Sequence, residues 1–496
     1  MTTELQSPPP DAATHPHHAR RWLILGVLGL AQLMVVLDAT IVNIALPSAQ
    51  TDLGFSNDAR QWIVTAYALA FGALLPLGGR VGDLIGRKRT LLIGLIGFAL
   101  ASAAGGAAQD FGLLVTARAA QGVFGALLAP AVLSLLTTTF TDAKERAKAF
   151  GIYGAIAGAG GAMGLLLGGV LTQYLDWRWC LYVNVIIAVA ATIGGVSLLH
   201  NQRTAGPRQR LDVPGAVLVS GGLFALVYGF ANAETHDWGD VAVWGWLILA
   251  AVLLAAFVAV QVRVAHPLVP LRVLLDRTRG GALFAVLMLG IGMFAVFLFL
   301  TYYLQQNLGF SPIRSGVAFL PMIAALSVTA TLATSMVVPR VGPRPLVPAG
   351  FLIGAAGMLW LTQLDATSTY AAGILGPLLV MGVGIGLAMA PAMTAGTSGV
   401  DPADAGVASA LVNTAQQVGG SVGTAVLSSI AASAAADYLT GRNPTPDIVA
   451  AASIHSYTTT YAWVAVFFVV GALVSGLLLR SGPLRTDPDA APAAHM

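Results

Sequence analysis

The feature that most constrains this chain is a succession of long apolar stretches, the first running from Trp22 to Leu46. About 20 mostly apolar residues suffice to cross the roughly 30 Å hydrocarbon core of a bilayer. Only 9% of the residues are charged, against roughly 25% in soluble proteins. The sequence therefore predicts an all-α integral membrane protein with fourteen transmembrane helices, near 22–46, 62–79, 90–108, 112–138, 150–172, 179–199, 214–232, 242–264, 281–304, 315–338, 346–364, 371–395, 405–433 and 458–479.

The basic residues predict how these spans are oriented. With the N-terminus inside, twenty of the 25 Lys and Arg residues fall in cytoplasmic segments, and Arg118 lies within a span. The four on the outside are Arg60, Arg178, Arg314 and Arg442. Because cytoplasmic loops carry an excess of Lys and Arg, both termini are predicted to be cytoplasmic. The apolar run after Arg21 is too long for the core of a secretion signal, so we expect an uncleaved first span.

Composition also excludes several classes of function. The net charge is only +3 and the basic residues lie in short scattered clusters, so no nucleic-acid partner is expected. The single cysteine, Cys180, cannot form an intramolecular disulfide or a Cys-based metal site. The eight histidines fall in tails or predicted loops, and the spans contain no paired acids. We therefore predict no catalytic residue, no metal and no cofactor, which leaves a membrane enzyme or sensor as a remote alternative.

A weak internal repeat indicates two similar halves. The stretch "GDLIGRKRTLLIGLIG" from Gly82 resembles "VPRVGPRPLVPAGFLIG" from Val338, at an offset of 256 residues. The aligned pairs are Gly86 with Gly342, Lys88 with Arg344, and Gly94 with Gly350. Two parallel repeats around a cleft are typical of transporters that bind substrate near the midplane.

The repeat predicts the following units. They are a cytoplasmic tail at 1–21, a six-helix bundle at 22–199, a linker at 200–280 with inserted helices at 214–232 and 242–264, a second six-helix bundle at 281–479, and a cytoplasmic tail at 480–496.

Two charged residues stand well inside the predicted spans, Asp38 and Arg118. Each costs about 2.5–3.5 kcal/mol at a helix centre on insertion scales, and such residues normally face a bundle interior or a wet cavity. Asp38 is either a structural anchor or a carboxylate that gains and loses a proton as its surroundings change. Arg118 either binds backbone carbonyls or biases the proton affinity of a nearby carboxylate. Gln121 and Gly122 share its helix face.

Two glycine-containing segments accompany these charges. "GGRVGDLIGRKR", Gly78 to Arg89, is a tight turn between two spans, and its simplest interpretation is a turn that fixes topology. The fifth span, "GIYGAIAGAGGAMGLLLGG" from Gly151, carries glycines at GxxxG spacing, which is typical of close helix packing. This segment lies within an apolar span without a preceding strand, so it is not a nucleotide-binding loop.

Together these segments resemble the major facilitator superfamily, in particular its fourteen-span drug/proton antiporter branch. "LDATIVNIALP" (Leu37–Pro47) is similar to the span-1 signature of that branch, and "RAAQGVFGA" (Arg118–Ala126) to its span-4 motif. "NTAQQVGGSVGTA" (Asn413–Ala425) is similar to its span-13 stretch. The loop motif is matched by Asp83, Gly86, Arg87 and Lys88, and the antiporter-motif helix by Gly151, Gly160, Gly164, Gly168 and Gly169.

The chain departs from the family pattern at two positions. Leu165 replaces the usual proline of the antiporter motif, so a straighter fifth span is expected. Leu84 stands where a basic residue is common in the loop motif. Some relatives that export divalent cations carry an extra acid in span 10, and its absence here argues against such cargo.

The resemblance implies a monomeric rocker in a bacterial cytoplasmic membrane that exchanges protons for a small lipophilic drug. Asp38 and Arg118 would couple the protons, and the loop motif would latch the halves, with Asp83 beside the start of span 13. A proton-coupled importer or facilitator of a metabolite is the alternative. Candidate cavity residues are polar, aromatic or Met side chains on spans expected to line the cleft: Asn43, Gln61, Trp62, Tyr67, Gln121, Tyr153, Met293, Tyr302, Gln305, Gln306, Asn413 and Gln417.

Overall fold

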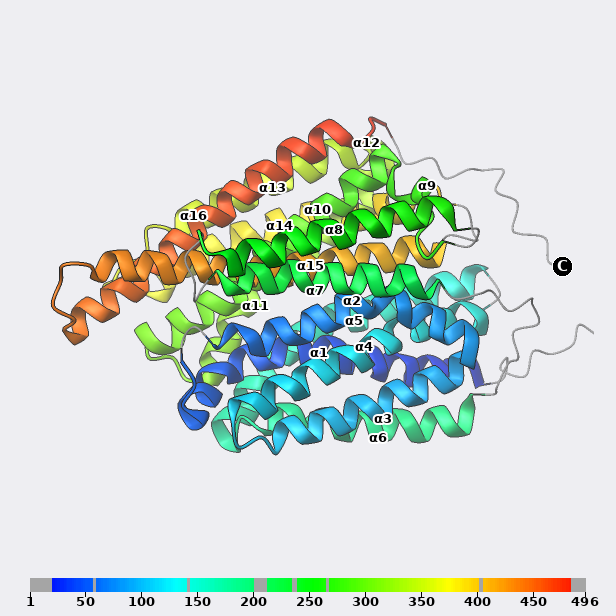
Figure 1. Cartoon of the computed structure of the whole chain (residues 1–496), viewed down its shortest axis with the longest axis horizontal. Coiled ribbons are helices and arrows are strands. Elements are labelled where there is room, and N and C mark those ends of the chain that lie inside the picture. The colour runs from blue at the N-terminus through cyan, green and yellow to red at the C-terminus, as the bar shows by residue number, and fades with distance from the viewer. Residues whose placement is uncertain are drawn as a thin grey trace, which may run out of the picture.

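Helices that run nearly side by side make up this protein (Figure 1). The computed structural model describes residues 20–56, 59–140, 143–199, 212–233, 239–264, 267–400 and 405–482, and within these ranges every regular element is helical. The predicted tails lie almost entirely outside the described residues.

Six helices form a first group. They are α1 (Arg21–Leu53), α2 (Gln61–Ile85), α3 (Arg87–Gly106), α4 (Phe111–Thr139), α5 (Ala143–Tyr174) and α6 (Trp179–Leu198). The next helices are α7 (Val213–Asn232), α8 (Val241–Arg263) and the short α9 (Leu271–Leu274).

A second group follows. Its members are α10 (Arg277–Ala295) with the π-helical η2 (Val296–Leu300) and η3 (Tyr303–Asn307), α11 (Pro312–Leu332) with η4 (Ala333–Val337) and α12 (Val338–Val341), α13 (Pro343–Leu361), η5 (Tyr370–Ile374) with α14 (Leu375–Thr397), α15 (Ala405–Leu439) and α16 (Pro446–Leu478).

Among the described residues, twelve helices are long and apolar enough to cross a membrane. The all-helical, membrane-spanning fold class is therefore confirmed. The other two predicted spans correspond to α2, whose apolar described part is Gln61–Leu75, and to α5, whose 32 residues begin with the charged segment "AKERAK". The count of fourteen spans stays a prediction.

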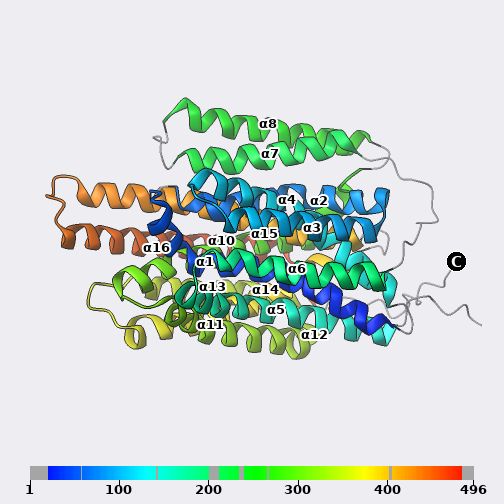
Figure 2. The same cartoon turned by 90° about the horizontal axis from the view of Figure 1, so that it is seen from below.

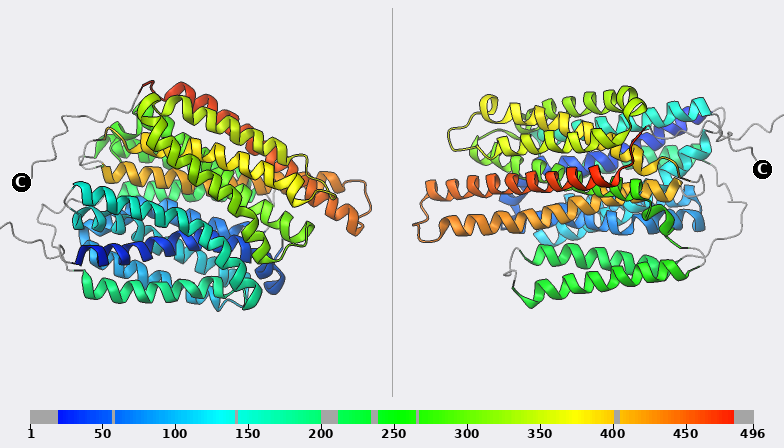
Figure 3. Two further views of the ribbon diagram at one scale, coloured as in Figure 1. Left: turned by 180° about the vertical axis from the view of Figure 1, so that it is seen from behind. Right: turned by 90° about the horizontal axis from the view of Figure 1, so that it is seen from above.

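The two ends of the helix bundle are named by the helices that begin, end or are joined there. We name the end at which α1 begins and α16 ends the terminal end, and the end at which α15 and α16 are joined the hairpin end. Helix α16 begins at Pro446, before the predicted span 458–479, and places proline in its first turn, where its missing N–H costs nothing. The α15–α16 hairpin projects beyond the other helices at the hairpin end (Figure 3).

The two halves repeat one turn geometry. Gly86 before α3 has a φ of 96° and Gly342 before α13 a φ of 77°, values that strain other residues. Lys88 Nζ then donates to a carbonyl in the last turn of α6 (2.9 Å), and Arg344 Nε donates to a carbonyl in the last turn of α16 (3.2 Å). The repeat predicted from the sequence thus has a structural counterpart at this turn.

The inserted pair, α7 and α8, lies along one flank of the molecule (Figure 2). Ser220 Oγ on α7 donates to Ala73 O on α2 (2.8 Å), and Ser429 Oγ on α15 donates to Ala233 O just after α7 (2.8 Å). The ring of Trp62 on α2 lies 5.6 Å from that of Tyr228 on α7. Helix α7 therefore contacts both groups along the line where α2 meets α15.

The two groups pack together mainly toward the hairpin end. One apolar cluster combines residues of both groups, from Leu37 to Phe55 in the hairpin half of the first and from Ala282 to Leu304 along α10 and its π-helical end in the second. A second cluster fills the terminal half of α1 to α6, and all of its described members belong to the first group. The arrangement is therefore closed at the hairpin end.

Candidate functional site

The most unusual contact in the core is an ion pair between α1 and α4. Arg118 Nη1 lies 2.6 Å from Asp38 Oδ2, and the side chains are 2% and 0% exposed. Both residues lie within long helices, α1 and α4, well inside their ends. The structure thus brings together the two charges that the sequence analysis singled out.

Two amides complete the surroundings of the Asp38 carboxylate. Gln121 Nε2 on α4 donates to Oδ1 at 2.9 Å, and Asn184 Nδ2 on α6 donates to the same oxygen at 2.7 Å. Gln121 Nε2 also lies 2.7 Å from Ser102 Oγ on α3. Four helices therefore contribute to one network, and its members are fully or almost fully buried.

Arg118 has further partners that fix its position. Its Nε donates to Ile63 O on α2 (3.1 Å) and its Nη1 to Gln121 Oε1 (2.9 Å). The guanidinium carbon lies 4.4 Å from the centre of the Tyr67 ring, within the range of a cation–π interaction. Both interpretations of Arg118 from the sequence, carbonyl binding and contact with a carboxylate, describe real contacts of the same side chain.

Glycines on α5 let α1 approach closely at this level. A Cβ atom on Gly160 would lie 3.2 Å from Val36, and one on Gly168 2.8 Å from the carbonyl of Ile41. A Cβ atom on Gly164 would overlap the Thr40 hydroxyl and lie 3.0 Å from the carbonyl of Leu37. This spacing of four residues is the small-residue pattern of close membrane helix pairs. The glycine face of α5 therefore packs on the same part of α1 that carries the acid.

The remaining antiporter-motif residues lie at two places. A Cβ atom on Gly169 would lie 2.6 Å from Ile313 Cα at the start of α11, so this glycine joins the two groups. Gly151 lies outside the residues described at side-chain level. Leu165 is buried, and α5 runs without interruption past it to Tyr174.

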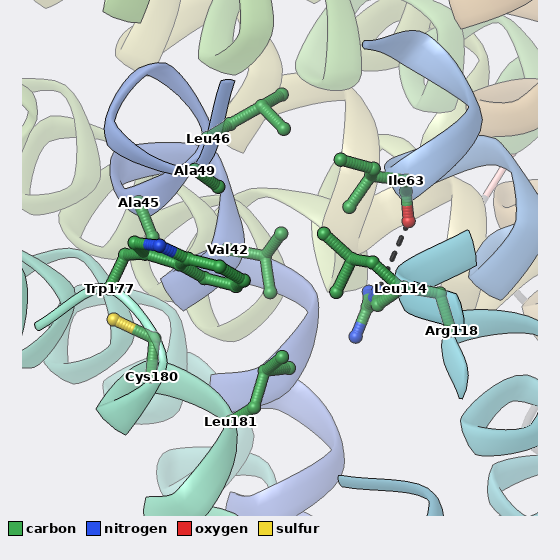
Figure 4. A pocket seen from close by; sticks show the side chains of 10 residues that line it. All are labelled: Val42, Ala45, Leu46, Ala49, Ile63, Leu114, Arg118, Trp177, Cys180 and Leu181. Carbon is green, nitrogen blue, oxygen red and sulfur yellow. Dashed lines mark hydrogen bonds between the residues drawn. The ribbon is translucent and has the colours of Figure 1, made fainter. Parts of the chain in front are cut away.

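A small cavity adjoins the ion pair toward the hairpin end (Figure 4). Its volume of about 10 Å³ is roughly the space of one water. Arg118 supplies its charged group, and the rest of the lining is mainly apolar: Val42, Ala45, Leu46, Ala49, Ile63, Leu114, Trp177, Cys180 and Leu181. The indole of Trp177 donates to Asp52 Oδ2 (3.0 Å), which also accepts from Arg178 Nη1 (2.6 Å).

Polar contacts across the two groups lie near the hairpin end. Tyr302 Oη donates to Gln50 Oε1 (2.8 Å), and Gln305 Nε2 donates to Ile44 O (3.1 Å). The guanidinium carbon of Arg60 lies 4.0 Å from the centre of the Tyr302 ring. Tyr302 and Gln305 stand in or beside the π-helical end of α10, a feature often found at functional sites.

Where α2 meets α15, several buried polar atoms have no hydrogen-bond partner among the described residues. On α2 they include both side-chain polar atoms of Gln61 and the hydroxyl of Thr65. On α15 they include the hydroxyls of Ser421 and Ser428. A Cβ atom on Gly72 would lie 3.0 Å from Gln417 Cβ, which places the two helices in direct contact. Unpaired buried groups are costly, so this contact favours a state in which it opens to water or substrate.

Other predicted cavity residues have separate environments. Asn43 donates to Ala39 O on its own helix (3.1 Å), and Asn413 to Ser409 O (3.0 Å). Tyr153 Oη donates to Gln32 Oε1 (2.5 Å) within the first group. Met293 packs against the mixed apolar cluster, Gln306 is exposed at the hairpin end, and Trp62 faces the inserted pair. The structure does not bring all the candidates into one site.

The predicted latch is only partly described. Lys88 donates to the end of α6, so this contact lies within the first group. Thr90 Oγ1 donates to Gly86 O (3.1 Å), and Arg87 is half-buried at the start of α3. Asp83 lies outside the residues described at side-chain level, and so does Asp404 at the start of the predicted span 13. A latch between the halves stays a prediction.

Comparison with known proteins identifies the family. The family model described as the Major Facilitator Superfamily matches residues 28–424. The chain belongs to the Major Facilitator Superfamily.

Relatives and a solved structure agree with this membership. The puromycin resistance protein pur8 of Streptomyces alboniger is 50% identical over 482 residues, which cover 97% of this chain and 95% of the relative. The cephamycin export protein CmcT of Amycolatopsis lactamdurans is 39% identical, covering 90% of each chain. The inward-facing, unoccupied structure of a bacterial homologue of the human lysosomal transporter Spinster shares the fold, with a TM-score of 0.64, 17% identity, and coverage of 93% of this chain and 97% of that one.

Sequence reasoning missed several residues of this transporter's core. Asn184 and Ser102 belong to the network of Asp38, and Arg60 contacts the ring of Tyr302. Asn184 is an amide within the apolar stretch "VNVII", so the rule that singled out Asp38 would have found it. The neighbours of Ser102 and Arg60 depend on how distant helices pack, and no local pattern indicates them.

Proposed function

We propose that this transporter exports a lipophilic drug or antibiotic from a bacterial cell in exchange for protons. The observation that carries the proposal is the sealed pair of Asp38 and Arg118, 2.6 Å apart in the core of the first group. A membrane protein that only needs to fold gains little from such costly residues. The names of the relatives, puromycin resistance at 50% identity and cephamycin export at 39%, support an antibiotic as the cargo.

In this proposal Asp38 carries the proton and Arg118 modulates it. Burial disfavours the charged form of a carboxyl group, whereas a nearby cation and hydrogen-bond donors favour it. A modest movement of α1 against α4 or α6 changes that balance. Proton uptake removes the negative charge that attracts Arg118, which loosens α1 from α4 and lets the groups rock. Proton release on the other side restores the pair.

The proposed orientation places the hairpin end outside and both termini in the cytoplasm. It is supported by the bias of twenty of the 25 Lys and Arg residues toward predicted inside segments. The arrangement closed at the hairpin end is then inward-facing. The proposed latch of Asp83, Gly86, Arg87 and Lys88 lies at the inside and forms when the terminal end closes.

The proton gradient alone is a sufficient energy source in this scheme, without a cofactor. One proton moving down 100 mV releases about 2.3 kcal/mol, and one pH unit adds about 1.36 kcal/mol. Because each 1.4 kcal/mol is tenfold, the sum supports a gradient of a few hundred-fold for a neutral drug. We propose that the transporter works as a monomer, since the network lies within one chain.

The test is a susceptibility assay on bacteria that express the chain, with puromycin as the first compound of a panel of lipophilic antibiotics. We expect wild type to raise tolerance to at least one compound, and Asp38→Asn to abolish the gain at equal membrane abundance. Asp365→Asn is the matched control. Asp365 lies in an exposed loop, where hydrogen bonds from Thr367 and Ser368 hold the pKa of its carboxyl below the usual range.

Direction is tested with the compound that responds. In inverted vesicles, where the cytoplasmic face is outside, an acid interior should drive accumulation, and dissipating the pH gradient should stop it. Accumulation by right-side-out vesicles instead would indicate the importer alternative. Full tolerance with Asn at position 38 would remove Asp38 from the mechanism.

A further inference from the structure

Among the described residues, every group that forms a hydrogen bond with the Asp38 carboxylate donates to it. Arg118 Nη1 lies 2.6 Å from Oδ2, and Gln121 Nε2 and Asn184 Nδ2 lie 2.9 and 2.7 Å from Oδ1. Such a cage suits a carboxylate, which only accepts. It does not suit a protonated acid, whose O–H needs an acceptor. A residue that carries a proton therefore needs a cage that can change.

The structure offers few acceptors for that O–H. Gln121 Oε1 already accepts from Arg118 Nη1 (2.9 Å), and Ser102 Oγ lies 2.7 Å from Gln121 Nε2. Asn184 is different, because its Oδ1 is buried and has no hydrogen-bond partner in the part of the chain that the structure describes, while the residue as a whole is 0% exposed. The Nδ2 group of Asn184 thus donates to Asp38, while its Oδ1 accepts no hydrogen bond from the described residues.

Resting on the proposed role of Asp38 as proton carrier, we propose that Asn184 is a positioning residue that follows the protonation state of Asp38 by rotating its amide. In the deprotonated state Nδ2 donates to the carboxylate. After a proton binds, a rotation of about 180° about the Cβ–Cγ bond exchanges the two ends of the amide. Oδ1 then accepts from the new O–H, so that Asn184 offers a partner to either form of Asp38 without a movement of α6.

The proton balance of this step is simple. One proton adds to one carboxylate oxygen, no other bond forms or breaks, and the same proton leaves when the acid is deprotonated. Arg118 stays charged, because its guanidinium does not release a proton in proteins. Arg118 keeps Ile63 O, Gln121 Oε1 and the ring of Tyr67 as partners. Loss of the ion pair therefore does not leave the cation alone.

Few other ionisable groups surround Asp38. Among the described residues, Arg118 comes from α4, Tyr67 from α2, and Cys180 from α6, which also carries Asn184. The face of α5 that packs there consists of the glycines at 160, 164 and 168, and α3 contributes the hydroxyl of Ser102. Arg118 is therefore the one charged side chain among these neighbours, and a change at Asn184 acts on Asp38 without a second charged neighbour to offset it.

Infrared spectroscopy of the purified full chain in lipid tests the proposal without a known drug. The C=O band of a protonated carboxylic acid is followed during a pH titration, and Asp38→Asn assigns the band. In Asn184→Leu the carboxylate loses a charge-assisted bond and the acid loses a weaker neutral one. We expect the midpoint to move about half to one unit toward higher pH. We also expect the band of the acid to move to higher wavenumber, because its O–H has no acceptor.

Thr460→Val is the matched control, since it removes a fully buried polar group of α16 that bonds Ser456 O instead (2.8 Å). Its midpoint and band should equal those of wild type. An unchanged midpoint in Asn184→Leu overturns the proposal, and so does a shifted midpoint with an unmoved band, because that pattern describes a donor that never accepts. If the leucine variant does not fold, Asn184→Ala removes the same two groups.

The same titration separates failure of this inference from failure of the proposed function. If wild type shows no band that disappears in Asp38→Asn, Asp38 does not carry a proton and the exchange mechanism fails. If the band is present but Asn184→Leu leaves it unchanged, only the role of Asn184 fails.

Discussion

The two helix groups share one architecture but bury different chemistry. The first group holds the Asp38–Arg118 pair with Gln121 and Asn184 around it. Among the described residues of the second group, the buried polar side chains other than tyrosine are all serines and threonines: Thr301, Ser315, Ser421, Thr424, Ser428, Ser429, Ser456, Thr460 and Ser475. At the offset of the repeat, Phe294 and Ile374 stand where the first group has Asp38 and Arg118.

This difference separates two tasks within a duplicated fold. A buried charge pair is sensitive to small displacements, because its energy depends on desolvation and on the exact partner atoms. Hydroxyls and aromatic rings adapt to varied contacts at a lower cost. In the proposed mechanism the first group therefore binds the proton, and the second group adapts its contacts as the transporter changes conformation and binds its substrate.

The largest effect is expected from breaking the pair. Arg118→Met leaves Asp38 buried without its cation, and removing one partner of a buried pair costs about 3–5 kcal/mol. Its thermal unfolding in detergent should begin far below that of wild type. Asp38→Leu combined with Arg118→Met should recover most of the loss while remaining inactive in transport. If the single variant unfolds like wild type, the pair does not distinguish the groups energetically.

A smaller effect is expected where α5 meets α1. Gly164→Ala places a methyl group against the Thr40 hydroxyl and 3.0 Å from the carbonyl of Leu37, and such overpacking costs about 1–3 kcal/mol. Gly161→Ala is the matched control, because nothing lies within 4 Å of its Cβ position. Melting curves should show a loss for position 164 and no loss for position 161, where alanine favours the helix. Equal losses at both would mean that the glycine face is not tightly packed.

The sequence predicts features that depend on local patterns but not the partners that come from distant helices. Helix positions, the pair of charges and the glycine face all follow from local patterns, since an acid in an apolar run and glycines at every fourth residue can be recognised in the sequence itself. The partners do not, because Asn184 and Ser102 reach Asp38 from helices that are distant in sequence. Helix α16 begins at Pro446, earlier than the predicted span 458–479, because an apolar pattern indicates a membrane span and not where its helix begins.

Opening at the hairpin end should respond to its hydrogen bonds. Tyr302→Phe removes the bond to Gln50 Oε1, which contributes about 0.5–1.5 kcal/mol to the closed arrangement. The closed population should therefore fall a few-fold relative to the open one. A pair of spin labels across the α1 and α11 ends at the hairpin end measures the distance distribution. A distribution identical to that of wild type would show that this bond does not hold the gate.

The smallest expected effect concerns the turn that the two groups have in common. Lys88 and Arg344 occupy matching turns, and each donates to the last turn of a neighbouring helix, α6 or α16. A cation at a helix C-terminus contributes about 0.3–1 kcal/mol. Lys88→Met and Arg344→Met should therefore lower the melting temperature by similar small amounts if both side chains only cap helices. The predicted latch uses the first-group turn alone, so a latch function of Lys88 should make Lys88→Met lower the transport rate more than its small effect on melting explains, whereas Arg344→Met should not.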